Sequence, residues 1–180
     1  RIVNANTFGA SAHKLAGSAY TLEQVITAGI ENCKRACAPY GALTALDVGP
    51  LGELLEPSGT LAFEDAVAEY ARIVKAGEAA GADLIFFETY TDLYELKAAL
   101  LAAKENTHLP ILASMSFEAG GRTFTGCTVE SFGVTARGLG ASAVGINCSL
   151  GPKEIFPMAK RLTEAVPGNF PVFVKPNAGL

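Results

Sequence analysis

The sequence predicts an α/β fold built on a parallel sheet, and two observations lead to this prediction. Short runs rich in β-branched and aromatic residues recur along the chain, and segments with an apolar stripe at helical spacing lie between them. Strands that alternate with helices in this way form parallel sheets with right-handed crossovers. The sheet is then either open and doubly wound, or closed into a (βα)8 TIM barrel.

Six runs are predicted to be buried parallel strands, because apolar residues dominate each of them. In chain order they are residues 1–8 (RIVNANTF), 42–50 (ALTALDVGP), 82–90 (ADLIFFETY), 109–117 (LPILASMSF), 143–149 (AVGINCS) and 171–179 (PVFVKPNAG). Four apolar stripes predict helices between these strands. The stripes are Leu22, Val25, Ile26, Ile30, Cys33 and Cys37; Phe63, Val67, Tyr70, Ala71 and Val74; Leu93, Leu96 and Leu100; and Ile155, Met158, Ala159 and Leu162.

Polar side chains lie at the C-terminal ends of the predicted strands and favour the barrel over the open sheet. They are Asn6, Thr7, Asp47, Glu88, Thr89, Ser116, Asn147, Cys148 and Asn177. The carboxyl ends of barrel strands meet at one mouth, where barrel enzymes keep their active sites, whereas an open sheet spreads them along an edge. We therefore predict a (βα)8 TIM barrel with about six of its eight strands in these 180 residues, the first and last strands being absent. Residues 1–180 are expected to form a single partial barrel domain.

Composition excludes several classes of partner. The net charge is -4 and no run of Lys or Arg occurs, which argues against nucleic acid as a partner. No apolar stretch reaches the roughly 20 residues that span a bilayer, so a membrane is not expected either. The four cysteines lack the spacing of a disulfide framework, which is typical of a reducing, cytoplasmic location.

Three residues could carry chemistry, and each also has a structural interpretation. Cys148 ends a predicted strand, where a thiol is either a ligand or nucleophile, or a small buried side chain. Glu88 follows an apolar run, so its carboxylate needs a partner such as a lysine, a backbone cap or a ligand. Lys175 is either a Schiff-base lysine, as in certain aldolases, or the partner of a barrel carboxylate. Cys33 and Cys37 share an apolar helical face and are expected to lie in the core.

Six segments, in order, resemble the homocysteine S-methyltransferase domain family. They are NANTFGAS, DVGPLGELLEP, AGADLIFFETYTDLYELKAAL, ILASMSFEAGGRTFTG, VGINCSLGPKEI and VKPNAGL, which are distributed along nearly the whole chain. Within that family the chain is most similar to the homocysteine-binding barrel of cobalamin-dependent methionine synthases. The resemblance implies a zinc ion held by three cysteines. Cys148 matches the first of them, and the adjacent pair that supplies the others does not occur in this sequence.

The resemblance also implies roles for other residues. Glu88 would form a salt bridge with the amino group of homocysteine, and Asn147 would either support the zinc ligand or contact the substrate. Thr7, Phe8 and Gly9 match a loop that lines the homocysteine pocket, although loop packing explains them equally well. Asp47 is ranked below Glu88, because it could simply cap the loop that follows its strand.

The expected function is that of a zinc-dependent homocysteine methyltransferase module that makes methionine. The methyl group would come from methylcobalamin, with cobalamin and methyltetrahydrofolate bound by other domains or chains. S-methylmethionine and betaine remain open as direct donors, a Schiff-base lyase using Lys175 is the rival enzyme, and a non-catalytic barrel fragment is the third alternative. With a single ligand of the implied zinc site in its sequence, the isolated chain is expected to hold no zinc and to be inactive.

Overall fold

A computed structural model describes residues 1–178 of the chain and confirms the alternation of strands with helices. One sheet contains six strands in sequence order, namely β1 (Ile2–Asn4), β2 (Leu43–Val48), β3 (Leu84–Tyr90), β4 (Ile111–Met115), β5 (Ala143–Asn147) and β6 (Val172–Lys175). The helices are α1 (Leu22–Cys37), α2 (Phe63–Ala79), α3 (Leu93–Asn106), α4 (Val129–Gly138) and α5 (Pro152–Ala165), with a short 3-10 helix at Ala38–Tyr40.

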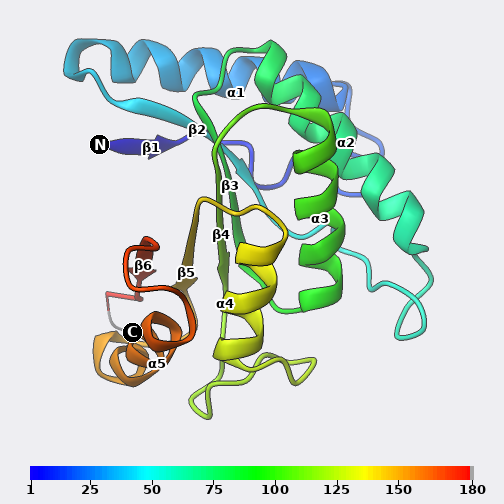
Figure 1. The fold of residues 1–180 in the computed structure, drawn as a ribbon. Helices are drawn as coiled ribbons and strands as arrows, with labels where there is room; N and C mark the ends of the chain where they lie inside the picture. Colours follow the sequence, from blue (N-terminus) through cyan, green and yellow to red (C-terminus); the bar gives the residue numbers. More distant parts are fainter. Residues whose placement is uncertain (179–180) are drawn as a thin grey trace.

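The sheet is curled, and its helices cover the outer face (Figure 1). Each strand pairs in parallel with the next strand of the sequence, as right-handed βα units require. The two ends of the sheet, β1 and β6, lie on either side of an open interior (Figure 1). This arrangement is a partial TIM barrel, so the prediction of a barrel with six strands present is confirmed.

The helices follow their sequence signals closely, with one omission. Thr21 starts α1 with a capping box, in which its hydroxyl accepts from the Gln24 amide and the Gln24 side chain accepts from the Thr21 amide. The predicted stripe of α1 is buried except for Val25, which is half-buried. Helix α4 was not predicted from an apolar stripe, because Gly and Thr interrupt its short sequence, VESFGVTARG. It is nevertheless capped by Thr128, whose hydroxyl accepts from the Ser131 amide.

Two apolar layers lie on opposite faces of the sheet. The larger layer packs the sheet against the helices, and it contains Cys33 and Cys37 as predicted. The smaller layer lines the inside of the curled sheet and consists of Ala45, Leu84 and Phe86, with Leu112 and Phe173 packed against them. Because successive side chains of a strand point to opposite faces, residues two positions further along these strands also face the interior.

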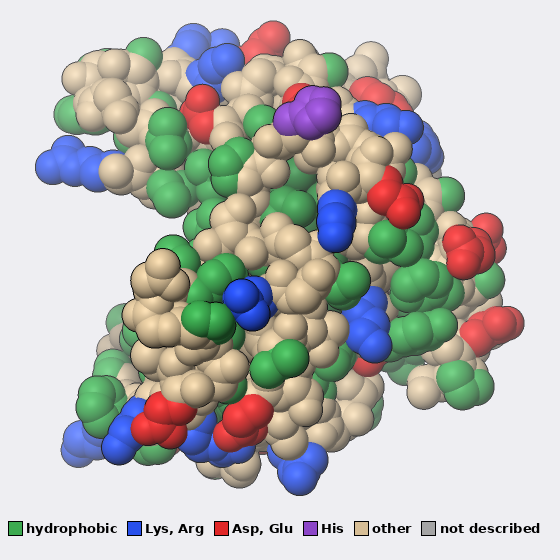
Figure 2. Space-filling view, viewed as in Figure 1, with side chains coloured by type: hydrophobic (Ala, Val, Ile, Leu, Met, Phe, Trp, Pro, Cys, Tyr) green, Lys and Arg blue, Asp and Glu red, His purple; other side chains and the backbone are tan. Residues whose placement is uncertain are grey.

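The interior opens as a hollow between the β1 end and the β6 end of the molecule (Figure 2). A cavity of about 530 Å³ lies there, lined by Asn4, Phe86, Leu112, Phe173 and Lys175 among others. Lys and Arg side chains are scattered over the visible face rather than gathered in a patch (Figure 2). Across residues 1–178, no helix combines the length and apolar character that crossing a bilayer demands.

Candidate functional site

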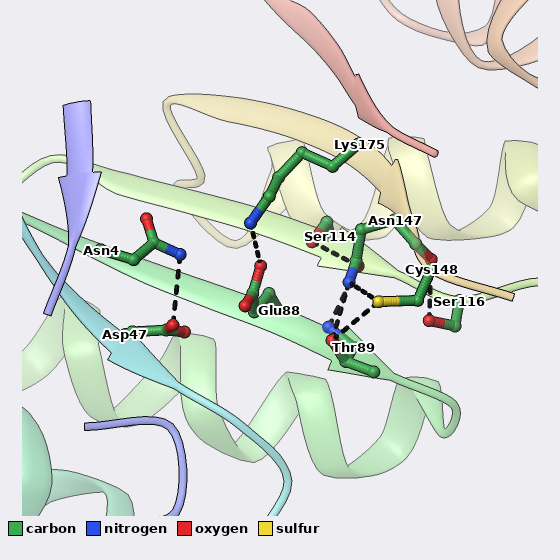
Figure 3. Close-up of polar contacts among 9 residues, drawn as sticks. All are labelled: Asn4, Asp47, Glu88, Thr89, Ser114, Ser116, Asn147, Cys148 and Lys175. Carbon is green, nitrogen blue, oxygen red and sulfur yellow. Dashed lines mark hydrogen bonds and ion pairs between the residues drawn. The ribbon is translucent and has the colours of Figure 1, made fainter. Parts of the chain in front are cut away.

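A layer of polar side chains closes the apolar interior at the carboxyl ends of the strands, and we call it the mouth layer. Its members are Asn4, Asp47, Glu88, Ser114, Asn147 and Lys175, one from each strand (Figure 3). Five of them stand two positions after an inward-facing small or apolar residue, namely Ala45, Phe86, Leu112, Gly145 and Phe173. Residues two positions apart on a strand face the same side, so each strand presents an apolar residue to the interior and then a polar residue at its carboxyl end.

A bulge in β3 positions two residues of this rim. The pairing of β3 with β4 shifts register between Phe87 and Tyr90, so Glu88 and Thr89 lie outside the regular ladder. Thr89 has a φ of 67°, a left-handed conformation that is rare for a β-branched residue. Bulges of this kind redirect side chains and are common near active sites. Here the bulge places the Thr89 hydroxyl beside the end of β5, while Tyr90 returns to the layer under the helices.

Asn147 ties three strand ends together around Cys148. Its Oδ1 accepts from the Thr89 amide at 3.1 Å and from the Ser114 hydroxyl at 2.7 Å. Its Nδ2 donates to Thr89 Oγ1 at 2.7 Å and to Cys148 Sγ at 3.1 Å. A carboxamide has two donor hydrogens and two acceptor lone pairs, so this side chain is fully used. The geometry supports the role of holding Cys148 over that of contacting a substrate.

Cys148 lies at the rim with its backbone fixed on both sides. It has a φ of 59°, as does Ser149, and its amide donates to the Lys175 carbonyl at 3.1 Å. Consecutive non-glycine residues in the left-handed region are strained, and such strain concentrates at functional sites. The sulfur is 3.8 Å from Thr89 Oγ1, one residue along β3 from Glu88. The structure therefore brings Cys148, Asn147 and the Glu88 segment to one place, as predicted for a barrel mouth.

Glu88 and Lys175 form an ion pair across the interior. Lys175 Nζ on β6 is 2.5 Å from Glu88 Oε2 on β3 (Figure 3). The same ammonium lies 4.7 Å from the centre of the Phe86 ring. The Glu88 side chain is 15% exposed, and Lys175 also lines the interior cavity. This contact agrees with the interpretation of Lys175 as the partner of a barrel carboxylate.

Asp47 is the unsatisfied member of the mouth layer. The residue is 6% exposed, and its Oδ2 accepts from Asn4 Nδ2 at 3.2 Å. Its Oδ1 has no hydrogen-bond partner, and within the part of the chain that the structure describes it is the one buried side-chain nitrogen or oxygen in that state. Burial, followed by the nearby negative charge of Glu88, raises the pKa of Asp47 to about 7. The site thus holds a buried carboxyl group, one oxygen of which has no hydrogen-bond donor.

The three predicted loop residues, Thr7, Phe8 and Gly9, have different surroundings. The Thr7 hydroxyl donates to the Asp47 carbonyl at 2.8 Å and accepts from the Asp47 amide at 3.1 Å, and the residue is buried. Phe8 is partly exposed, with its ring against Gly49 and Lys14 Nζ 5.3 Å from its centre. Gly9 is exposed, and a Cβ built there would meet nothing. Thr7 therefore fixes the strand that carries Asp47, and of these three residues Phe8 and Gly9 are exposed.

The remaining cysteines lie apart from the mouth layer. Cys33 and Cys37 are buried on α1 with their sulfurs 3.8 Å apart, and burial raises the pKa of the Cys33 thiol. Cys127 is half-buried and donates to the Thr128 carbonyl at 3.3 Å. Among residues 1–178, no three His, Cys, Asp or Glu side chains are close enough to hold a metal ion. Of the three zinc ligands that the resemblance implies, this chain presents Cys148 alone.

Sequence reasoning left four contributors to the site without a role. Thr89 and Ser116 were noted as strand-end polar residues, and the structure shows that Ser116 Oγ donates to the Asn147 carbonyl at 2.8 Å. Ser114 and Asn4 were not singled out. The signal that would have found Ser114 is its position, two residues after an inward-facing leucine on the same strand.

These features define a class of protein: a partial TIM barrel with a cysteine, two carboxylates and a lysine gathered at the carboxyl ends of its strands. Comparison with known proteins identifies the family. The profile of the homocysteine S-methyltransferase family matches residues 1–180, so the chain belongs to that family, as the sequence motifs indicated.

Curated relatives and solved structures agree with this assignment. The chain is 34% identical over 105 residues to methionine synthase of Mycobacterium tuberculosis and 32% identical over 105 residues to that of Mycobacterium leprae. The match covers 56% of this chain and 9% and 8% of those proteins, so the chain spans a small part of their length. The metallated homocysteine methyltransferase MmuM from Escherichia coli superposes with a TM-score of 0.82 at 18% identity, covering 99% of this chain and 67% of MmuM. The oxidized form of MmuM gives a TM-score of 0.85 at 20% identity, with 99% and 66% coverage. These structures share the fold.

Proposed function

We propose that residues 1–180 form the homocysteine-binding part of a barrel methyltransferase that converts homocysteine to methionine. The substrate would lie in the mouth layer, with its sulfur beside Cys148 and its ammonium group between Asp47 and Glu88. The observation that carries this proposal is the buried, unpartnered Oδ1 of Asp47 beside a second carboxylate. Family membership supports homocysteine as the amino acid.

An ammonium group is the ligand that best complements these two carboxylates. A buried carboxyl group without a partner costs folding free energy, and it is retained where a ligand supplies the missing donor. Glu88 uses Oε2 for Lys175, and Asp47 uses Oδ2 for Asn4. An ammonium group carries three donors and one positive charge, so it can satisfy Asp47 Oδ1 and offset the repulsion between the two carboxylates. Notably, Asp47 thereby gains a role equal to the one that the resemblance gives Glu88.

Cys148 is proposed as one ligand of a catalytic zinc ion, in the arrangement that the resemblance implies. The residues described here do not complete such a site, because Cys148 is the sole thiol at the rim. When bound, zinc supplies an acidic centre that favours the thiolate form of a coordinated thiol. The chain's own contribution is to hold the Cys148 sulfur by the Asn147 amide and by its left-handed backbone.

Methyl transfer then requires a donor that approaches the open side of the mouth. The sulfur of homocysteine would take the methyl group, and the donor would keep the bonding electron pair. We propose methylcobalamin as the donor, with cobalamin and methyltetrahydrofolate bound by other domains or chains, because the curated relatives that match are methionine synthases. Direct transfer from S-methylmethionine or betaine is the alternative, and the mouth layer serves either chemistry.

Metal analysis together with a methyl-transfer assay tests the proposal. The 180-residue chain should contain no stoichiometric zinc and should not methylate homocysteine. A chain extended to include an opening strand and a strand with an adjacent cysteine pair should gain both properties. In the extended chain, Cys148→Ala should remove zinc and activity. Tight zinc binding by the short chain that survives Cys148→Ala would overturn the proposed site.

The matched control is a cysteine of the outer layer. Cys33→Ala in the extended chain should keep zinc and methyl transfer, because the Cys33 sulfur donates to the Val3 carbonyl and contacts Cys37, in the layer between the sheet and the helices. Supplying methylcobalamin, S-methylmethionine or betaine in parallel assays identifies the donor. Activity with none of the three, in a chain that binds zinc, would contradict the assignment of a homocysteine methyltransferase.

A further inference from the structure

We propose that Lys175 binds the carboxylate of the amino-acid substrate, and that this contact selects α-amino acid thiols over simple aminothiols. The proposal deepens the proposed function and rests on it. One juxtaposition supports it. The backbone of Lys175 is hydrogen-bonded to Cys148, and its side-chain ammonium contacts Glu88. Lys175 thus joins the region proposed for the substrate sulfur to the region proposed for its ammonium group.

The backbone and side chain of Lys175 fix this position. Lys175 pairs with Asn147 in the β5–β6 register, and its carbonyl accepts from the Cys148 amide at 3.1 Å. Its side chain then crosses the mouth to Glu88 Oε2 (Figure 3). Its ammonium also lies over the Phe86 ring. Glu88 Oε2 is the side-chain partner that the structure shows for the Lys175 ammonium, which has three donors, so donors remain for a further acceptor.

Charge and connectivity then place the substrate carboxylate. In an α-amino acid the ammonium and carboxylate groups are attached to the same carbon atom. If the substrate ammonium lies between Asp47 and Glu88, the substrate carboxylate must lie close to these two side chains as well. Lys175 is the only basic side chain that lines the interior cavity over residues 1–178. Two carboxylates and one lysine therefore complement a zwitterion, with the acidic groups facing its ammonium and the lysine facing its carboxylate.

The test compares two thiols that differ by one group: homocysteine and aminopropanethiol, which is homocysteine without its carboxylate. In the full-length protein, Lys175→Met should raise the KM of homocysteine about tenfold and leave kcat nearly unchanged, since the charge-assisted hydrogen bond is made in the ground state as well. The KM of aminopropanethiol should stay unchanged or fall, because Glu88 is released. Lys175→Arg should restore most of the preference for homocysteine. Lys160→Met, on the exposed surface of α5, is the matched control and should change neither value.

Two results would overturn this role. An equal rise in the KM of both thiols would mean that Lys175 acts only through Glu88. An unchanged or lower KM for homocysteine in Lys175→Met would mean that the lysine does not bind the carboxylate. If Lys175→Met fails to fold, the unmodified protein still decides the matter, since it must bind aminopropanethiol about tenfold more weakly than homocysteine in calorimetry; equal affinity contradicts the proposal.

Binding and turnover separate this proposal from the function on which it rests. A protein that binds homocysteine in preference to aminopropanethiol through Lys175, but transfers no methyl group to either, would keep the carboxylate site and reject the methyltransferase. A protein that methylates both thiols with equal KM would keep the methyltransferase and reject the role of Lys175.

Discussion

Two buried carboxyl groups lie on opposite faces of the same sheet and differ in one respect. Glu95, in the first turn of α3, is 5% exposed, and its Oε1 accepts from the Leu51 amide at 2.7 Å and from the Tyr70 hydroxyl at 2.9 Å. Asp47, inside the curl, is 6% exposed, and its Oδ1 accepts from nothing. Burial raises the pKa of both groups. A perturbed pKa therefore does not separate a structural carboxyl group from a functional one here, whereas the count of hydrogen bonds does.

The surroundings explain the difference. Glu95 holds the loop after β2, whose Gly49 carbonyl also accepts from the Tyr90 hydroxyl at 3.2 Å. This cluster is complete without any ligand. The mouth layer contains a second carboxylate and a lysine, and one acceptor remains unused. We infer that the first region serves to fix the loop, and that the second is kept incomplete for a substrate.

The largest expected effect of this difference is on substrate binding. Glu88→Gln in the full-length protein should weaken homocysteine binding by roughly 2 to 5 kcal/mol while zinc stays bound, because it removes the charge that we propose to pair with the substrate ammonium in a desolvated site. Glu95→Gln is the matched control and should leave the affinity unchanged. Isothermal titration of both variants measures the effect, and equal affinities would return Glu88 to a structural role.

Stability should respond to Asp47 in a pH-dependent way. The pKa of Asp47 is about 7 in the folded protein, against an ordinary value of 3.8. The folded state therefore binds this proton more tightly than the unfolded chain, so the free energy of unfolding falls as the pH rises from about 4 to about 7. Asp47→Asn removes that penalty and should raise the free energy of unfolding by about 2 to 4 kcal/mol at pH 8, with little change at pH 4. Urea unfolding at the two pH values tests this, and a loss of stability at pH 8 would contradict it.

Removal of the other carboxyl group should have the opposite sign. Glu95→Ala leaves the Leu51 amide and the Tyr70 hydroxyl buried without an acceptor, so it should lower the free energy of unfolding by about 1 to 3 kcal/mol. Glu95→Gln keeps an acceptor oxygen and should cost less. If Glu95→Ala stabilised the protein as Asp47→Asn is expected to, the distinction between the two carboxyl groups would be wrong.

The smallest effect is expected in the outer layer, away from both carboxyl groups. Cys33→Ala and Cys37→Ala should each cost at most about 1 to 2 kcal/mol of stability, through lost packing. Zinc content and methyl transfer should not change in the extended chain. A loss of metal in either variant would show that these buried thiols take part in the site.

Much of the fold could be predicted from the sequence, because buried parallel strands leave long apolar runs and their helices leave regular stripes. The ends of the elements were less predictable. β1 covers only Ile2–Asn4 and β6 only Val172–Lys175, so Asn6, Thr7 and Asn177 lie beyond the strands they were expected to end. In α4 the stripe was too short and too rich in small residues to be noticed.

The site was predictable in its location but not in its bonding. Strand ends placed Glu88, Asn147 and Cys148 together, and the pairing of Lys175 with a barrel carboxylate was one of the two interpretations considered. The bulge at Thr89 and the unpartnered oxygen of Asp47 depend on neighbouring strands. No local pattern encodes them, since hydrogen-bond satisfaction is a property of the assembled sheet.

A structure of the full-length protein with bound homocysteine tests the central claim most directly. We predict the substrate ammonium within hydrogen-bonding distance of Asp47 Oδ1 and of Glu88, with the sulfur on the side of Cys148. An ammonium group that contacts neither carboxylate, or a sulfur remote from Cys148, would contradict the assignment of the mouth layer as the amino-acid thiol site.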